Sequence, residues 1–221
     1  MARRKGFWRD NSLSLVMLGL FLLFWVGQSV AGLLHHNEDQ REHGQPQVSY
    51  GAYLRSGEFL EATFENWESE FFQMAAFVVL AGVLYQRGSG ESKDPDEDGS
   101  EARKELQAEE GAPAPVMRGG LALKLYSHSL SLALFALFAA SFLLHAASGA
   151  AARSEEAQAH GQPPVTMLQY LGTSSFWFES LQNWQSEFLS VAVLVLLSIV
   201  LREKGSPESK EVNAPHDKTG K

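Results

Sequence analysis

The apolar residues of this chain are gathered into four blocks, and charged segments separate the blocks. The blocks cover residues 12–34, 71–85, 121–147 and 188–201. The overall composition, 45% hydrophobic and 20% charged, resembles that of a soluble domain, but a soluble domain interleaves its apolar and charged residues. This distribution predicts an all-α membrane protein with four transmembrane helices.

The lengths of the blocks set the predicted spans. Residues 12–34 contain no charge and make a helix of about 34 Å, enough to cross a hydrocarbon core of about 30 Å. A cleaved signal peptide would show the same basic start, but the related mid-chain segment 129–147 favours a span. The second and fourth blocks give only about 21–23 Å, so their helices should start near Trp67 and Trp184. The predicted spans are 12–34, 66–86, 121–148 and 183–203.

An internal repeat organises the chain. Residues 11–93 align with residues 128–210 without a gap, and 31 of the 83 aligned positions are identical. Each copy carries two predicted spans, so both copies should enter the membrane with the same orientation, as two tandem parallel-repeat hairpins. The expected organisation is a first hairpin at 1–87, a linker at 88–120, a second hairpin at 121–204 and a tail at 205–221.

The positive charges predict the orientation of the hairpins. Only three of the 18 Lys and Arg residues, Arg41, Arg55 and Arg153, fall in the loops within the hairpins. Because Lys and Arg favour the cytoplasmic side, both termini and the linker should be cytoplasmic in a multi-pass protein of the plasma membrane. The outer loops are amphipathic. Each should form a short helix after its proline, with a break near residues 56–57 or 173–174 before the next long helix.

The linker and the tail have a different composition. Both are rich in charged residues, Gly, Ser and Pro and poor in large apolar residues. Such segments bury too little surface to offset the loss of conformational entropy. The sequence therefore predicts a disordered acidic cytoplasmic linker at 88–120 and a disordered tail at 205–221.

Two repeated carboxylates are the sharpest candidates for an ion site. Glu70 and Glu187 lie at the predicted edge of the membrane, one helical turn after Asn66 and Asn183. A carboxylate at this depth is costly unless it is paired, hydrated or turned into the bundle. If the four residues converge, they form a polar site for a proton or a cation. Alternatively, the carboxylates remain hydrated in the first turns of their helices, where their negative charge complements the helix dipole.

Other repeated residues favour structural roles. Trp67, Trp184 and Trp8 are predicted anchors at the membrane interfaces. A repeated turn is formed by His43, Gly44, Gln45 and Pro46 and by His160, Gly161, Gln162 and Pro163. The chain has no cysteine, and haem between spans would need histidines on facing helices. The second and fourth spans have none, so we expect no catalytic, cofactor or metal site.

Three motifs resemble an uncharacterised bacterial integral-membrane family, a domain of unknown function. They are the opening stretch 6–15, the turn at 43–46 and the stretch 64–71. The resemblance covers nearly the whole chain apart from the linker and the tail. It implies a bacterial membrane protein but no activity, cofactor or catalytic residue. In the second copy Gln182 and Gln185 replace Glu65 and Glu68, which argues against a role that needs four identical carboxylates.

These observations predict a non-enzymatic structural or interaction component of the cell envelope. Its expected partners are the lipid bilayer and a second copy of the chain or another envelope protein, and no nucleic acid. The alternative is a small proton- or cation-handling carrier or channel subunit that uses the repeated Asn and Glu pairs.

Overall fold

The computed structural model describes residues 6–96 and 111–220, and these residues form nine helices and no strand. Four helices are long: α2 (Ser12–Glu42), α4 (Gly57–Val83), α8 (Ser129–Ala159) and α10 (Ser174–Leu197). The short helices are α1 (Phe7–Asp10), α3 (Tyr50–Tyr53), α6 (Ala114–Arg118), α7 (Gly120–Ser127) and α9 (Met167–Leu171). The chain is therefore all-helical where it is described.

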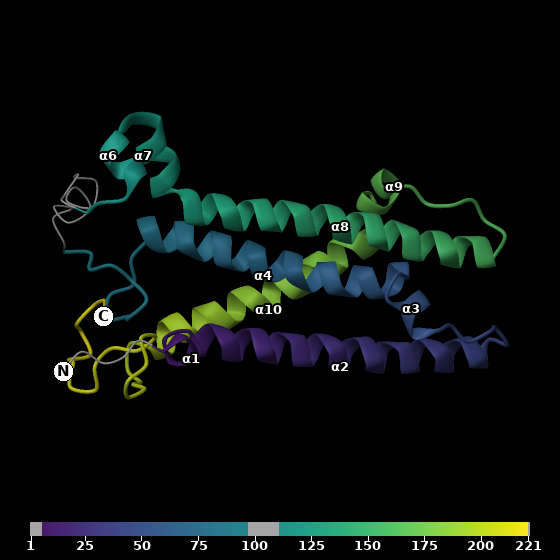
Figure 1. Ribbon diagram of the computed structural model, residues 1–221, viewed down its shortest axis with the longest axis horizontal. Coiled ribbons are helices and arrows are strands. Elements are labelled where there is room, and N and C mark those ends of the chain that lie inside the picture. Colours follow the sequence, from purple (N-terminus) through teal and green to yellow (C-terminus); the bar gives the residue numbers. More distant parts are fainter. Residues whose placement is uncertain (1–5, 97–110, 221) are drawn as a thin grey trace.

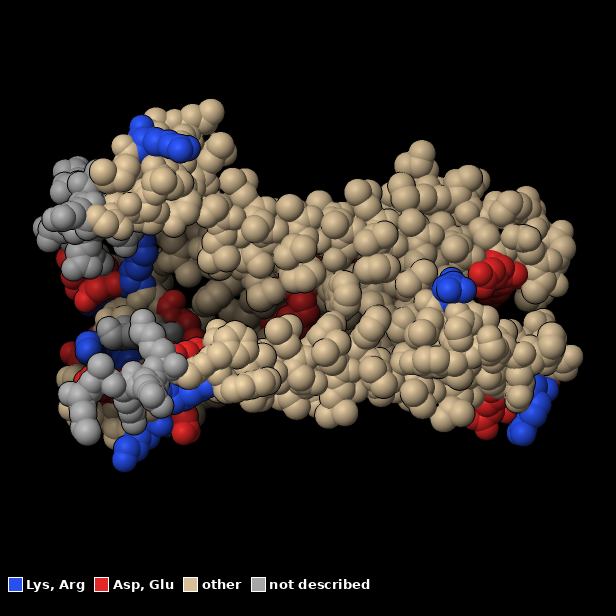
Figure 2. All heavy atoms as spheres, in the orientation of Figure 1, with Lys and Arg blue, Asp and Glu red and all other residues tan. Residues whose placement is uncertain are grey.

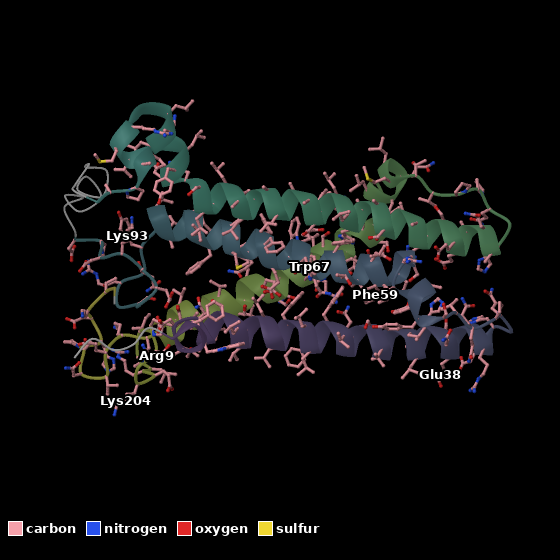
Figure 3. The ribbon with its side chains drawn as sticks, viewed as in Figure 1. Arg9, Glu38, Phe59, Trp67, Lys93 and Lys204 are labelled. Atoms are coloured by element: carbon pink, nitrogen blue, oxygen red, sulfur yellow. The ribbon has the colours of Figure 1, made fainter. Side chains whose placement is uncertain are left out.

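The long helices run along one common direction. Helices α2, α4 and α8 lie roughly parallel in Figure 1, and α10 crosses them obliquely. The two termini, α6 and α7 lie at one end, and α3 and α9 lie toward the other. Arg9, Lys93 and Lys204 lie at the first end and Glu38 at the second (Figure 3). We call these the terminal end and the loop end.

Burial in this bundle is the reverse of that in a soluble protein. Among the described residues, seven apolar residues are buried, against fourteen polar or charged ones. Large apolar side chains such as Leu23 and Phe24 of α2 are more than 60% exposed. Charged groups gather at the two ends, while most of the length between them shows uncharged residues (Figure 2).

Two helices are long and apolar enough to cross a membrane. Within the described residues these are α2 and α8, with 31 residues each. Only 6% of the most apolar window of α2 and 17% of that of α8 are buried inside the protein. The core helix of a soluble protein would be mostly buried, so these helices present their apolar side chains outward.

The loop end has the predicted short helices and breaks. Helix α3 is capped by Ser49 and α4 by Ser56, whose hydroxyls accept hydrogen bonds from backbone N–H groups in the first turn. Thr166 and Thr173 cap α9 and α10 in the same way. These caps satisfy N–H groups that a helix start leaves unpaired, which explains why each long helix restarts after its break.

The terminal end differs from the sequence-based expectation in two places. The segment 121–148 is not one helix, because His128 ends α7 and α8 begins at Ser129. The tail, predicted to be disordered, contacts the segment after α4: Lys210 is 1% exposed and donates to the carbonyl oxygens of Gly88 and Lys218. Part of the predicted disordered linker, 97–110, lies outside the described residues.

Two glycines allow the helices to approach closely at the loop end. A Cβ atom on Gly57 would lie 2.3 Å from the backbone nitrogen of Ala152, so α4 and α8 touch backbone to backbone there. A Cβ atom on Gly149 would lie 2.3 Å from the ring of Tyr170. This contact seats Tyr170, on α9, directly over α8.

Candidate functional site

Three glutamates lie along one face of α4. Glu61, Glu65 and Glu68 are spaced by four and three residues, which places them on the same side of a helix. That side meets α8 and α10, because all three side chains hydrogen-bond to residues of the second half of the chain. The loop-end half of the bundle therefore holds several carboxylates between its helices.

Glu68 is paired with the one histidine of the described residues that is completely buried. The Nδ1 atom of His145, on α8, lies 2.7 Å from a carboxylate oxygen of Glu68, and both side chains are 0% exposed. The indole nitrogen of Trp184 donates to the other oxygen of Glu68 at 3.1 Å. The His145 ring also stacks on Phe176 at 4.8 Å. In a neutral imidazole one ring nitrogen carries the proton, so an Nδ1–H that donates to Glu68 leaves a lone pair on Nε2.

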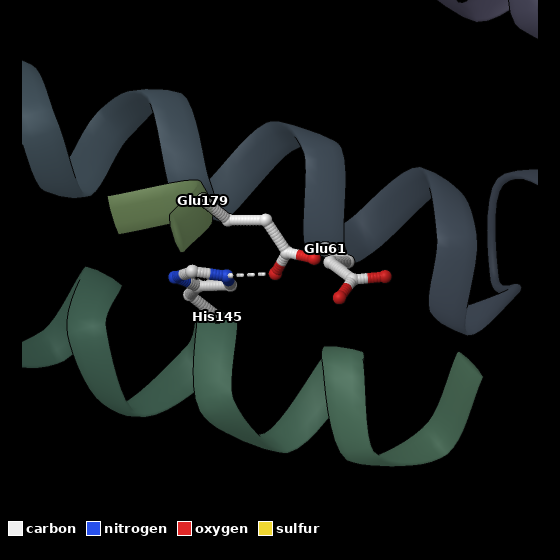
Figure 4. A group of neighbouring side chains, drawn as sticks. All are labelled: Glu61, His145 and Glu179. Carbon is white, nitrogen blue, oxygen red and sulfur yellow. Dashed lines mark ion pairs between the residues drawn. The ribbon is translucent and has the colours of Figure 1, made fainter. Parts of the chain in front are cut away.

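That second ring nitrogen has no hydrogen-bond partner. The Nε2 atom of His145 is buried, and its nearest charged atom is a carboxylate oxygen of Glu179, 3.7 Å away. Figure 4 shows Glu61 from α4, His145 from α8 and Glu179 from α10 converging on one place. A buried polar atom without a partner typically costs about 1–3 kcal/mol, so the position calls for an explanation.

Tyr170 joins two carboxylates of this group. Its hydroxyl lies 2.6 Å from an oxygen of Glu61 and 2.5 Å from an oxygen of Glu179. A phenol has one proton and can donate to only one carboxylate at a time. Burial, followed by the two carboxylates, raises the pKa of Tyr170 above its usual range, so the phenol stays protonated.

Positive charge near these carboxylates is limited. Arg153 donates to Glu179 at 3.4 Å and also to Ser175. Ser175 in turn donates to Glu179 at 2.8 Å, and Asn183 donates to Glu65 at 2.5 Å. The four glutamates of this region therefore outnumber its one arginine and one histidine. We call Glu61, Glu65, Glu68, His145 and Glu179 the carboxylate–histidine cluster.

A cavity at the loop end leads to this cluster. Its volume is about 480 Å³, and it lies between the last turns of α2 and α8 and the first turns of α4. Its charged and imidazole-bearing lining residues are His36, Asp39, His43, Glu58, Glu61, Arg153, Glu155, Glu156 and His160. Glu61 belongs both to this lining and to the cluster. The cavity, which we call the vestibule, therefore adjoins the cluster at Glu61, and its lining carries more carboxylates than cationic groups.

The structure does not unite the four residues that the repeat singles out. Asn66 is exposed and donates to the backbone of its own helix at Ala62, and Asn183 turns to Glu65. Glu70 is exposed, while Glu187 is half-buried. Neither belongs to the carboxylate–histidine cluster.

The structure gives the surroundings of the three predicted tryptophan anchors and the hydrogen bonds of the repeated turn. Trp8 is 76% exposed, whereas the ring of Trp67 packs against that of Phe21 on α2 and the indole nitrogen of Trp184 donates to Glu68. In the repeated turn, the imidazoles of His43 and His160 hydrogen-bond to backbone carbonyls four residues earlier, each at 2.9 Å. Gly44 and Gly161 both adopt a φ of 70°, as the chain reverses direction after each long helix.

Sequence reasoning missed the cluster although two signals for it were available. One is the spacing of Glu61, Glu65 and Glu68 along a single helical face. The other is that the two copies differ at these positions: His145 aligns with Gln28, and Glu68 with Gln185. A search for repeated residues passes over a site whose members occur once each.

A family model described as a domain of unknown function, DUF6766, matches residues 4–221. The chain therefore belongs to this family, whose function is not known. No curated protein and no solved structure matches the chain.

Proposed function

We propose that this chain is a non-enzymatic, multi-pass membrane protein of the bacterial envelope that binds a cation between its helices. The reversed burial described above supports the membrane part, because large exposed apolar surfaces are favourable against lipid and costly in water. Helices α2 and α8 supply two apolar spans. Helices α4 and α10, with 27 and 24 residues, reach about 40 and 36 Å alongside them, which makes four spans.

The element boundaries support two tandem hairpins. The starts of α2, α3 and α4 recur in α8, α9 and α10, each 117 residues later. Buried tyrosines recur too: Tyr53 covers Gly32, and Tyr170 covers Gly149. Equal spacing of helix starts, caps and aromatic contacts is what duplication of a two-helix unit produces.

Single cysteines test the proposed orientation directly, because the chain has no cysteine of its own. We expect Glu38→Cys to react with a membrane-impermeant maleimide in intact cells, and Lys204→Cys to react only after the inner membrane is opened. The two positions lie at opposite ends of the bundle (Figure 3). Equal labelling of both in intact cells would contradict a protein with cytoplasmic termini.

One observation carries the proposed function: the buried, unpartnered Nε2 of His145 among the carboxylates of Glu61 and Glu179. A bound cation removes the cost of the unpartnered nitrogen and offsets the repulsion between the two carboxylates. The vestibule supports the same function, since its excess of carboxylates attracts cations from the loop end.

Cation-dependent stability in lipid nanodiscs tests this proposal. We expect at least one cation, from a panel of monovalent and divalent chlorides, to raise the midpoint of thermal unfolding in a saturable way. Glu61→Gln should reduce this shift, because it removes a charge from both the vestibule and the cluster. Glu38→Gln, an exposed change on α2 outside the vestibule lining, should leave it unchanged.

Two other results would replace the proposal with one of its alternatives. If no cation shifts the unfolding midpoint, a purely structural or interaction role is favoured. If the double variant Glu70→Gln with Glu187→Gln removes the shift and Glu61→Gln does not, the site is the membrane-edge pair and the carrier hypothesis is favoured.

A further inference from the structure

We propose that Glu61, Glu179 and the Nε2 atom of His145 coordinate a divalent transition-metal ion, with Zn²⁺ as the representative. The inference rests on the cation-binding function proposed above and specifies the ion and its ligands. Each residue offers one ligand atom, and all three atoms lie within 4.8 Å of one another.

The distances describe a site that must contract slightly to hold the ion. Ligand atoms about 2.0–2.2 Å from a tetrahedral ion are about 3.3–3.6 Å apart. The Nε2 atom of His145 and the Glu179 oxygen, at 3.7 Å, are already close to this spacing. Glu61 comes from a third helix and also lines the vestibule. Closing ligand atoms that lie within 4.8 Å of one another to about 3.3–3.6 Å requires a side-chain movement of about 1 Å.

The orientation of His145 is the strongest argument for a metal. A histidine that binds a metal through one nitrogen almost always donates its other N–H to a carboxylate or carbonyl, which fixes the ring and its tautomer. Glu68 accepts from Nδ1 at 2.7 Å, and Trp184 holds Glu68 in turn. The free nitrogen is thereby aimed at the two remaining carboxylates (Figure 4).

The ligand set favours a transition metal over Ca²⁺ or Mg²⁺. Ca²⁺ takes six to eight oxygen ligands, and Mg²⁺ takes oxygen ligands in an octahedral arrangement. Here one of the three candidate ligand atoms is the buried imidazole nitrogen of His145. An imidazole with two carboxylates suits Zn²⁺ and neighbouring ions of the first transition row.

The vestibule provides a path for the ion. His36, His43 and His160 line it together with the carboxylates. An ion that enters the vestibule therefore meets imidazole and carboxylate groups before it reaches the buried site. Glu61 lies at the junction. An ion that arrives from the loop end thus meets Glu61 before it reaches His145.

Metal binding by the full chain in nanodiscs tests the inference. The protein is purified without a polyhistidine tag, treated with a chelator and titrated with Zn²⁺ against a chromogenic competitor, and with Co²⁺ by visible absorption. We expect one tightly bound equivalent per chain, with no competition from excess Ca²⁺ or Mg²⁺. Zinc-edge X-ray absorption of the wild-type complex should show one imidazole and oxygen ligands, a readout that needs no variant to fold.

Three variants separate the ligands from their surroundings. His145→Gln should weaken Zn²⁺ binding by more than about 100-fold, because loss of a ligand costs more than the 10- to 100-fold loss of a carboxylate that orients it. Glu68→Gln should weaken binding by about 10- to 100-fold, since Glu68 acts through His145. Glu38→Gln should bind as the wild type does.

The outcomes distinguish this inference from the function on which it rests. If Zn²⁺ binds with unchanged affinity in His145→Gln, or if the absorption spectrum lacks an imidazole, the metal site is overturned while cation binding stands. The same holds if only Ca²⁺, Mg²⁺ or a monovalent ion stabilises the protein. If no cation binds, both proposals fail.

Discussion

Replacing Glu68 with alanine is expected to lower the free energy of unfolding by about 2–6 kcal/mol, because it leaves two hydrogen-bond donors without an acceptor, each at a typical cost of about 1–3 kcal/mol. The carboxylate is 0% exposed, and it accepts hydrogen bonds from His145 and from Trp184. The substitution leaves the buried His145 and the half-buried Trp184 without this acceptor, and it also leaves a cavity between α4, α8 and α10.

Reversible unfolding in mixed micelles, followed by tryptophan fluorescence, measures this effect. Glu68→Gln keeps an oxygen that can accept from one donor, so its loss should be smaller than that of the alanine variant. Glu38→Ala serves as the control because Glu38 is exposed on α2, and it should change stability by less than about 0.5 kcal/mol. Equal losses for Glu68→Ala and Glu38→Ala would show that the pair does not hold the helices together.

Replacing Gly57 with alanine is expected to cost about 1–3 kcal/mol, as overpacking of a close contact does. The added methyl group would lie 2.3 Å from the nitrogen of Ala152 and 2.9 Å from the carbonyl oxygen of Ser148. These are backbone atoms of α8, which cannot move aside as a flexible side chain can. Helices α4 and α8 would have to separate.

Gly51 provides the matched control for this variant. It lies in α3, and a Cβ atom there would meet nothing within 4 Å. Gly51→Ala should therefore be neutral or slightly stabilising, because alanine has the higher helix propensity. If Gly57→Ala is as harmless as Gly51→Ala under the same unfolding conditions, α4 and α8 do not make this backbone contact in the membrane.

The features that sequence reasoning predicted correctly are local ones. The breaks near residues 56–57 and 173–174, and the short helices before them, depend on residues only a few positions apart in the chain, such as the caps Ser56 and Thr173 that the structure shows. The break at His128 is local as well, but the apolar residues on both sides of it conceal it. An apolar block sets the length of a hydrophobic stretch and does not show where the helix inside it is interrupted.

The carboxylate–histidine cluster could not be assembled from the sequence in the same way. Glu61 and Glu179 are 118 positions apart, and His145 comes from a third helix. Which faces of these helices meet is decided by packing, including the close approach at Gly57 and the seating of Tyr170 over Gly149. Equivalence between the copies favoured Glu70 and Glu187, whereas none of the five members of the cluster has a counterpart of the same type in the other copy.

The distribution of the ligands over the chain has a consequence for how the two halves cooperate. Glu61 belongs to the first half of the chain, while His145 and Glu179 belong to the second. Neither half carries all three side chains. Ion binding at the proposed site is therefore coupled to the packing of the two halves against each other. A substitution that weakens this packing should also weaken the affinity for the ion.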